Sequence, residues 1–324
     1  MTLTELRYIV ALAQQRHFGR AAEATFVSQP TLSVAVKKLE EELGVTLFER
    51  GPHEVTLTSI GAQIVEQAQR ALEQVAAIVE IAKHGKDPLV GTLRLGLNYT
   101  ISPYLLPLLI PQLQKKAPHM SLLIQENYTS RLLEMLKLGE LDVIVIASEV
   151  NEPGLIEQAL YDETFVVAMP QGHRWAKRKF ITAEDLAEES LLLLGSGHCF
   201  RDQVLKFCPA LNRTAAASGS MQKNLAGSSL ETMRHMVASG IGITVLPSTS
   251  VPHFSATANQ TPNHLDNMLA YRPFAKPAPD RRVSLVWRSS FPRLAAIEVL
   301  RQAILNCPLQ GIKKLRSTII QPPA

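Results

Sequence analysis

The stretch FVSQPTLSVAVKKLEEELG, residues 26–44, decides the fold of the N-terminal segment. Ser28 is a favourable N-cap, and Pro30 falls in the first helical turn, where its missing N–H costs nothing. Gly44 is placed to end the helix, because glycine readily takes the left-handed conformation of a C-terminal cap. One helical face is apolar at Leu32, Val36, Leu39 and Leu43. The stretch therefore predicts an amphipathic helix with one buried side and one polar side.

The segments on either side of this helix complete a small N-terminal unit. Residues 4–15 carry apolar residues at helical spacing, and residues 18–25 indicate a short alanine-rich helix. Residues 45–58, VTLFERGPHEVTLT, predict two short strands around a Gly-Pro turn. This order is the outline of a winged helix-turn-helix, to which we assign residues 1–58. An ordinary three-helix bundle with a polar surface is the alternative.

The exposed side of the helix that begins at Ser28 carries residues that suit DNA. Glutamine, threonine and serine near a helix start can meet base edges, while a lysine and backbone N–H groups meet phosphate. The positions off the buried stripe are Gln29, Thr31, Ser33, Val34 and Lys37. Net charge does not indicate DNA binding. Residues 1–58 hold six Lys/Arg against seven Asp/Glu, and the whole chain has a net charge of only +4.

Residues 58–84 hold no proline and predict one long amphipathic helix. Its length favours a dimerisation arm that packs against a second copy, and a helix lying on its own domain is the alternative. Residues 85–88 mark a boundary, so we assign residues 59–88 to a linker helix. The narrow apolar seam consists of Ile60, Ile64, Ala68, Ala71, Val75, Ile78 and Ala82.

From residue 89 onward, strand-like and helix-like segments alternate, which is typical of an α/β domain with parallel buried strands. We expect two lobes with a cleft between them, since ligands bind at the carboxyl ends of such strands. Residues 182–189 are expected to form a helix, and the polar residues 253–264 an exposed loop. The expected ranges are 89–162 and 267–311 for lobe I, 163–266 for lobe II, and 312–324 for a C-terminal tail.

Composition and the lack of targeting signals in the sequence predict where the protein is located. Hydrophobic residues make up 46% and charged residues 19% of 324, which is typical of a globular protein. The N-terminus lacks a basic leader, and no apolar run is long enough for a membrane span. We therefore expect a cytosolic protein with reduced thiols. A cysteine pair there is more often catalytic, redox-sensing or metal-binding than a structural staple.

Two of the three cysteines lie in GHCFRDQVLKFC, residues 197–208. We expect a helix from about Phe200, which places Cys199 at its N-terminus beside His198 and Arg201. A helix start and cationic neighbours both favour the thiolate, the form that a peroxide oxidises. Idle buried thiols remain an alternative, whereas a metal site is disfavoured because there is no CxxC motif. Cys307 has no such setting and is expected to be a bystander.

The spacing of the two cysteines has a mechanical consequence. Nine helical steps separate their Cα atoms by ~13 Å at ~1.5 Å per residue. A disulfide requires Cα atoms within about 7 Å. If the segment is helical when reduced, a bridge between Cys199 and Cys208 therefore demands that the helix unfold.

Residues 18–50 are similar to the DNA-binding signature of LysR-type transcriptional regulators. The similarity rests on the paired alanines, on SQPTLS, on the LE and LG that follow, and on LFER before the wing. It implies binding to double-stranded promoter DNA. The implied major-groove residues are Gln29, Pro30, Thr31, Ser33 and Lys37, with Arg50, Pro52 and His53 near the DNA backbone or minor groove.

Residues 197–208 and 228–247 resemble the hydrogen-peroxide-sensing subgroup of the same family, and the likeness covers most of the chain. It implies that Cys199 reacts with peroxide, that Cys208 is its disulfide partner, and that the effector domain is shaped like a periplasmic binding protein. The implied peroxide pocket consists of Thr100, Thr129, Gly197, His198 and Arg282, with the adjacent Arg281 as the alternative for the last position.

These features predict a peroxide-responsive transcription regulator, mainly an activator of antioxidant genes, in the bacterial cytoplasm and associated with the nucleoid. The resemblance further implies a homotetramer built as a dimer of dimers, recruitment of RNA polymerase, and a cellular dithiol that reduces the bridge. No cofactor, metal or membrane partner is expected. A LysR-type regulator that senses a small metabolite in the interlobe cleft is one alternative. A thiol peroxidase is another, but the DNA-binding head argues against an enzyme.

Overall fold

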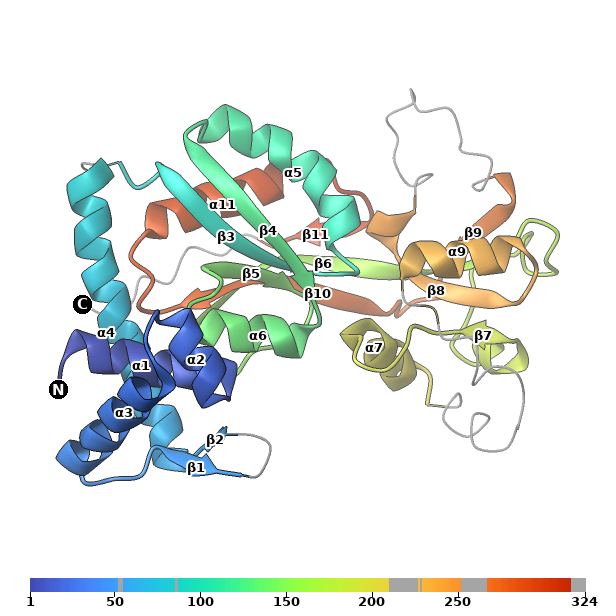
Figure 1. The fold of residues 1–324 in the computed structure, drawn as a ribbon. Coiled ribbons are helices and arrows are strands. Elements are labelled where there is room, and N and C mark those ends of the chain that lie inside the picture. The colour runs from blue at the N-terminus through green and yellow to red at the C-terminus, as the bar shows by residue number, and fades with distance from the viewer. Residues whose placement is uncertain (52–54, 85–86, 210–226, 228, 252–266, 316–324) are drawn as a thin grey trace.

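A computed structural model of the chain describes residues 1–51, 55–84, 87–209, 227, 229–251 and 267–315. A helical head and a long linker helix are followed by two α/β lobes, and the chain returns to lobe I after it has formed lobe II (Figure 1). Pro52 and His53 of the predicted wing and the predicted loop 253–264 lie outside these ranges. Within the described ranges, every helix is too short or too polar to cross a lipid bilayer.

The head folds as the winged helix-turn-helix that the sequence predicts. Thr2 and Glu5 form a reciprocal capping box on the first helix, and Ser28 Oγ accepts a hydrogen bond from the Thr31 amide at 3.3 Å. Gly44 ends the third helix with a φ of 69°. The apolar faces of the three helices meet in one core. The elements are α1 (Leu3–Gln15), α2 (Phe18–Ala24), α3 (Gln29–Leu43), β1 (Phe48–Arg50) and β2 (Val55–Leu57).

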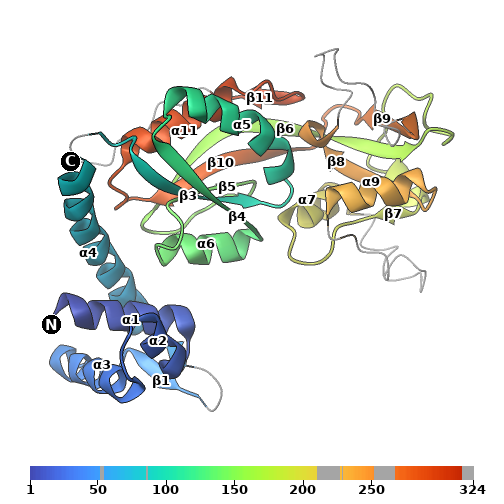
Figure 2. The same cartoon turned by 45° about the horizontal axis from the view of Figure 1, so that its top comes forward.

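The linker helix α4 (Ser59–His84) has the length that the sequence predicts. It leads from the head along lobe I to the start of the effector domain (Figure 2). Its apolar seam is buried within the subunit only in part, because Ala68 is buried whereas Ile60 and Ile78 are 42% and 67% exposed. The surface position of these isoleucines fits a second copy of the helix, and the dimerisation role stays a prediction.

Lobe I is built on strands in the order β4-β3-β5-β10-β6. The first three strands are parallel, whereas β10 runs antiparallel to both β5 and β6, so the predicted parallel arrangement does not hold for the strands that cross to lobe II. Helices α5 and α11 cover one face and α6 the other. The elements are β3 (Gly91–Asn98), α5 (Ser102–Lys116), β4 (Met120–Asn127), α6 (Thr129–Lys137), β5 (Val143–Ile146), β10 (Asp280–Arg288) and α11 (Leu294–Asn306).

Lobe II is connected to lobe I by the long strand β6 (Leu155–Pro170). The first part of β6 pairs with β10, and its second part pairs with β8 and β9. The other elements of the lobe are η1 (Asp185–Glu188), β7 (Leu191–Leu192), α7 (Cys199–Phe207), α9 (Leu230–Ala238), β8 (Ile243–Pro247), η3 (Ser248–Ser250) and β9 (Leu269–Pro273).

The expected helix at residues 182–189 and two expected domain boundaries are wrong. The helix expected at 182–189 is only the short turn η1, because Leu186 is the one fully buried residue there and offers little apolar face for a longer helix. Strand β9 belongs to lobe II, since it pairs with the second part of β6, so lobe II extends past residue 266. Residues of the expected tail form β11 (Ile312–Lys314), which pairs with β6.

The head and the linker helix lie against lobe I of the same subunit. Glu73 of α4 forms an ion pair with Arg288 Nε at 2.6 Å and accepts a hydrogen bond from Ser290 Oγ at 2.7 Å. Burial lowers the pKa of the Arg288 guanidinium, and the Glu73 carboxylate opposes that shift. Arg16, the cap that follows α1, also pairs with Glu134 of α6 at 2.9 Å. We call Glu73, Arg288 and Ser290 the linker clamp.

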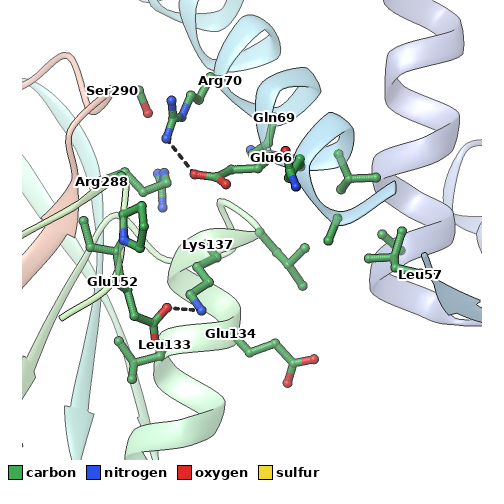
Figure 3. A pocket seen from close by; sticks show the side chains of 18 of the residues that line it. Leu57, Glu66, Gln69, Arg70, Leu133, Glu134, Lys137, Glu152, Arg288 and Ser290 are labelled. Carbon is green, nitrogen blue, oxygen red and sulfur yellow. Dashed lines mark hydrogen bonds and ion pairs between the residues drawn. The ribbon is translucent and has the colours of Figure 1, made fainter. Parts of the chain in front are cut away.

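A cavity of about 760 Å³ lies beside the linker clamp, with walls from the head, α4 and lobe I (Figure 3). Its charged side chains point toward one another in pairs. Arg70 contacts Glu66 at 2.6 Å, and Lys137 forms an ion pair with Glu152. These pairs neutralise the charges of the wall within the protein, so the cavity presents little charge to a ligand.

We predict that Glu73→Gln destabilises the protein more than Glu66→Gln does. The side chains of Arg288 and Glu73 are only 6% and 12% exposed, so the variant leaves a buried cation without its carboxylate. Such a loss costs roughly 3 kcal/mol, against less than about 1 kcal/mol for the half-exposed Glu66–Arg70 pair. Urea unfolding followed by circular dichroism measures both variants. Equal losses of stability would contradict the importance of the linker clamp.

Candidate functional site

A small cavity lies where the two lobes meet. Its volume is about 10 Å³, close to the space that one water-sized molecule needs. Lobe I contributes the last residues of β3 and β4 and those that follow them, and lobe II contributes the start of α7 with the two residues before it. The lining residues are Asn98, Tyr99, Thr100, Asn127, Tyr128, Gly197, His198 and Cys199. Three predicted site residues, Thr100, Gly197 and His198, therefore lie together with Cys199.

Cys199 is the first residue of α7, as the sequence predicts within one position. Gly197 precedes it with a φ of 96°, a left-handed conformation in which a side chain would be strained. Cys199 is partly exposed, and it lies at the helix start, where the first backbone N–H groups have no partner within the helix. Arg201, expected beside the thiol, donates from Nη1 to the carbonyl oxygen of Leu194 at 2.9 Å.

His198 does not act as the cation that the sequence reading assumed. The imidazole is only 6% exposed and packs edge-on against Tyr128, with ring centroids 4.9 Å apart. Burial lowers the pKa of His198 from its ordinary value of 6.5, so the ring is neutral near pH 7. A neutral imidazole offers one hydrogen-bond donor and one acceptor beside Cys199.

Arg281, and not Arg282, contacts the wall of the cavity from β10, through Thr100. Its guanidinium donates from Nη1 to Thr100 Oγ1 at 2.8 Å and from Nε to Glu163 at 2.8 Å, and it lies 5.2 Å from the centroid of the Phe200 ring. Arg282 is exposed and pairs with Asp162 at 2.8 Å. The prediction for Arg282 is therefore wrong in placement, because successive side chains of a strand point to opposite faces.

Thr129 lies behind the lining of the cavity and is joined to it by Asn98. The Thr129 hydroxyl accepts a hydrogen bond from Asn98 Nδ2 at 2.9 Å, while Asn98 Oδ1 accepts one from the Ala147 amide at 3.2 Å. Asn98 was missed in the sequence, although a polar residue at the carboxyl end of a buried strand was a usable signal. Tyr99, Asn127 and Tyr128 were missed as well.

Cys208 lies at the opposite end of α7, away from the cavity. It is 1% exposed, and its thiol donates to the carbonyl oxygen of Ala183 at 2.9 Å. Phe200 and Val204 of α7 are buried in the same core of lobe II. No disulfide joins the two sulfurs, and the helical rise puts their Cα atoms ~13 Å apart. The structure is therefore that of the unbridged pair, with an intact helix between the two sulfurs.

Cys307 is buried in lobe I and separate from this pair. Its thiol donates to the carbonyl oxygen of Ala303 at 3.3 Å, and burial raises the pKa of the thiol to about 11. At neutral pH the sulfur is almost fully protonated, and a thiol is a poor target for peroxide. These properties agree with the expectation of a bystander.

Five of the residues predicted to contact DNA lie in α3. Ser33 is half-buried, and Lys37 is exposed with a long ion pair to Glu41 at 3.7 Å. Arg50 is the last residue of β1, and His53 lies outside the described residues. Glu40 has a structural role, because it accepts hydrogen bonds from the amides of the segment leading into β1. The remaining predicted contacts are exposed at Gln29, Pro30 and Thr31.

Family models match both parts of the chain. Residues 3–62 match the bacterial regulatory helix-turn-helix protein, lysR family, and residues 86–306 match the LysR substrate binding domain. The "DNA-binding transcriptional dual regulator OxyR" of Escherichia coli K12 is 40% identical over 94% of this chain and 95% of its own. The "hydrogen peroxide-inducible genes activator" of Haemophilus influenzae is 34% identical over 97% of this chain and 100% of its own.

Solved structures agree with these matches. A full-length OxyR variant from Pseudomonas aeruginosa has a TM-score of 0.74 and 50% identity, covering 96% of this chain and 99% of that one. A reduced form of OxyR from Neisseria meningitidis has a TM-score of 0.63 and 39% identity, covering 69% of this chain and 99% of that one. The chain therefore belongs to the LysR family of bacterial helix-turn-helix regulators and, within it, to the OxyR group.

Proposed function

We propose that the protein regulates transcription in response to hydrogen peroxide through a reversible disulfide between Cys199 and Cys208. One observation carries the proposal: Cys199 opens the helix α7 at a cavity of about 10 Å³, and Cys208 closes the same helix. A cavity of that size excludes a metabolite-sized ligand and suits only a molecule of about the size of water, the class to which hydrogen peroxide belongs. The names of the relatives, which describe activators of peroxide-inducible genes, support the same stimulus.

The chemistry needs two thiols and one peroxide. The Cys199 thiolate attacks a peroxide oxygen, so that an S–O bond forms, the O–O bond breaks, and the departing hydroxide takes a proton to leave as water. The Cys208 sulfur then attacks the sulfenic sulfur, forms the disulfide and releases a second water. Two thiols lose two electrons in total, and a cellular dithiol returns them when the bridge is reduced.

Thr100 and Arg281 assist the first step. Because Thr100 Oγ1 already accepts a hydrogen bond from Arg281, the hydroxyl hydrogen is left to donate to an oxygen in the cavity. Donation to the departing oxygen stabilises the negative charge that develops there. The neutral imidazole of His198 offers a second polar group to the bound peroxide, and Thr129 holds Asn98 in place.

Formation of the Cys199–Cys208 disulfide requires that helix α7 unfold. Cys208 must leave the carbonyl of Ala183, and the two Cα atoms must approach from ~13 Å to within about 7 Å. The ring of Phe200, 4.9 Å from that of Phe165, and the ring of Phe207, 5.2 Å from that of Phe274, hold the helix on lobe II. The oxidation of two thiols by peroxide supplies the free energy that offsets this cost, and the closed loop then restricts the unfolded segment.

The oligomeric assembly couples the change in lobe II to DNA binding. The protein forms a homotetramer, a dimer of dimers, in which exposed apolar residues of α4 such as Ile60 and Ile78 pack against a second copy. Repacking of lobe II then alters the spacing of the DNA-binding heads on promoter DNA, and the altered complex recruits RNA polymerase at antioxidant genes. The protein acts in the cytoplasm, at the nucleoid, as a regulator rather than as an enzyme.

We expect peroxide to consume two thiols per subunit and a dithiol reductant to restore both. The Cys199→Ser variant should lose no thiol to peroxide. The Cys208→Ser variant should lose one thiol and remain a sulfenic acid, because the second thiol that would form the disulfide is missing. Thiol titration with promoter-binding assays measures each step. Cys307→Ser is the matched control and should respond like the unchanged protein, since burial keeps that thiol protonated. Unchanged DNA binding after full oxidation of Cys199 would contradict the switch, and sustained peroxide turnover at enzymatic rates would favour a peroxidase.

We predict that Arg281→Lys slows the oxidation of Cys199 by roughly tenfold or more, because a lysine cannot bond Thr100 and Glu163 together as the guanidinium does. The lysine keeps a positive charge beside buried Glu163, so the fold is retained. Arg282→Lys is the matched control on the opposite face of β10 and should react at the unchanged rate. Stopped-flow thiol oxidation measures both. A slower reaction in the Arg282 variant alone would contradict the placement of Arg281.

A further inference from the structure

Phe26 is the most exposed large apolar side chain in the described part of the chain, at 95% accessible. It lies in the turn between α2 and α3, two residues before the cap Ser28. An aromatic ring left in water loses the large stabilisation that its burial provides. A single exposed apolar side chain is common on protein surfaces, so the case for a contact rests on the position of this ring directly before α3.

The backbone conformation of Phe26 is one that phenylalanine rarely adopts. The residue has a φ of 56°, and its amide donates to the carbonyl oxygen of Glu23 at 3.1 Å, while the next amide, of Val27, donates to Ala22 at 3.0 Å. This is a helix-ending turn, at which glycine or asparagine is usual. A bulky side chain in the left-handed region is disfavoured, and such outliers occur at functional positions. Neither packing nor backbone geometry explains a phenylalanine here.

The surface around Phe26 has the chemistry of a base-reading face. Val34 of α3 is also exposed, at 67%. Gln29 supplies a hydrogen-bonding amide and Lys37 a cation for phosphate. Phe26 is three residues from Gln29, so their Cα atoms lie within about 11 Å of each other. In the major groove, the apolar group at the base edges is the C5-methyl of thymine.

We propose that Phe26 contacts a thymine methyl group in the major groove and thereby sets part of the DNA sequence preference. The inference rests on the proposed DNA-facing surface of α3 and adds a residue that precedes the helix. The ring fills the space beside the methyl group, and the contact buries apolar surface that is exposed in the free protein. The occupant is double-stranded DNA, and association of Phe26 with a second head is an outcome that the test separates.

The test begins with duplexes selected from a random-sequence library by the unchanged full-length protein under reducing conditions. Fluorescence anisotropy then compares the unchanged protein with Phe26→Gly on the best duplex. We expect the variant to bind roughly 5-fold more weakly and to lose a thymine preference in each half-site. Its thermal midpoint should not fall, because glycine suits the left-handed turn. Weaker binding without loss of stability distinguishes a DNA contact from a structural role.

Replacing the preferred thymine by uracil removes only the methyl group and isolates the contact. The uracil duplex should bind the unchanged protein roughly 5-fold more weakly and should make no difference to Phe26→Gly. Leu43→Ala is the matched control, since Leu43 is 37% exposed at the far end of α3, and it should keep the full response to uracil. Equal effects of uracil on the unchanged protein and on Phe26→Gly overturn the proposal.

Three further outcomes are decisive. If Phe26→Gly binds all duplexes as the unchanged protein does, while Gln29→Ala and Lys37→Ala bind more weakly, only the role of Phe26 is refuted. If none of the three variants changes binding, the DNA-facing surface of α3 is itself wrong. A change in the oligomeric state of Phe26→Gly, measured by light scattering, assigns the ring to contact between heads and also overturns the proposal.

Discussion

Helix α7 is the constraint on which the account depends, because it holds the two thiols of interest apart. Cys199 begins the helix and Cys208 follows its last residue, so an intact α7 and a Cys199–Cys208 disulfide exclude each other. Phe200 and Val204 fasten the helix to the core of lobe II, and Gln203 donates to the carbonyl oxygen of Ala147 in lobe I at 2.5 Å. A chemical event at one sulfur therefore cannot be completed without disturbing contacts in both lobes.

Strand β10 carries two buried arginines that connect the cavity and the linker helix to the central sheet. Arg281, near its start, fixes Thr100 at the cavity, and Arg288, its last residue, holds Glu73 of the linker helix. Both arginines are buried and both are paired with carboxylates, so neither can be removed without leaving a charge uncompensated in the interior. The sensing cavity and the attachment of the DNA-binding head thus share one strand of the central sheet.

Much of this arrangement could be predicted from local sequence. The cap Ser28, the stop Gly44 and the apolar spacing between them define α3, and a helix between Cys199 and Cys208 follows from its own apolar spacing. The choice between Arg281 and Arg282 could not be predicted, because both phases of a strand are compatible with DRRVSLVWR until its pairing with β6 is known.

Long-range contacts account for the other failures. Glu163 lies 118 residues from Arg281, and no local pattern marks it as the carboxylate that orients the pocket arginine. The cationic role expected of His198 failed because burial by Tyr128 and its neighbours, which no local pattern reports, lowers the pKa of the imidazole. Strand β9 was assigned to the wrong lobe since its partner in β6 is about a hundred residues away in the chain.

Amide hydrogen exchange of residues 199–208 in the reduced and the peroxide-oxidised protein tests the central claim most directly. In the reduced protein, the backbone hydrogen bonds of α7 should protect these amides. After oxidation the same amides should lose protection, while those of β3 and β5 in lobe I remain protected. A Cys199–Cys208 disulfide in a segment whose protection is unchanged would contradict the account, because the helix would then have survived the bridge.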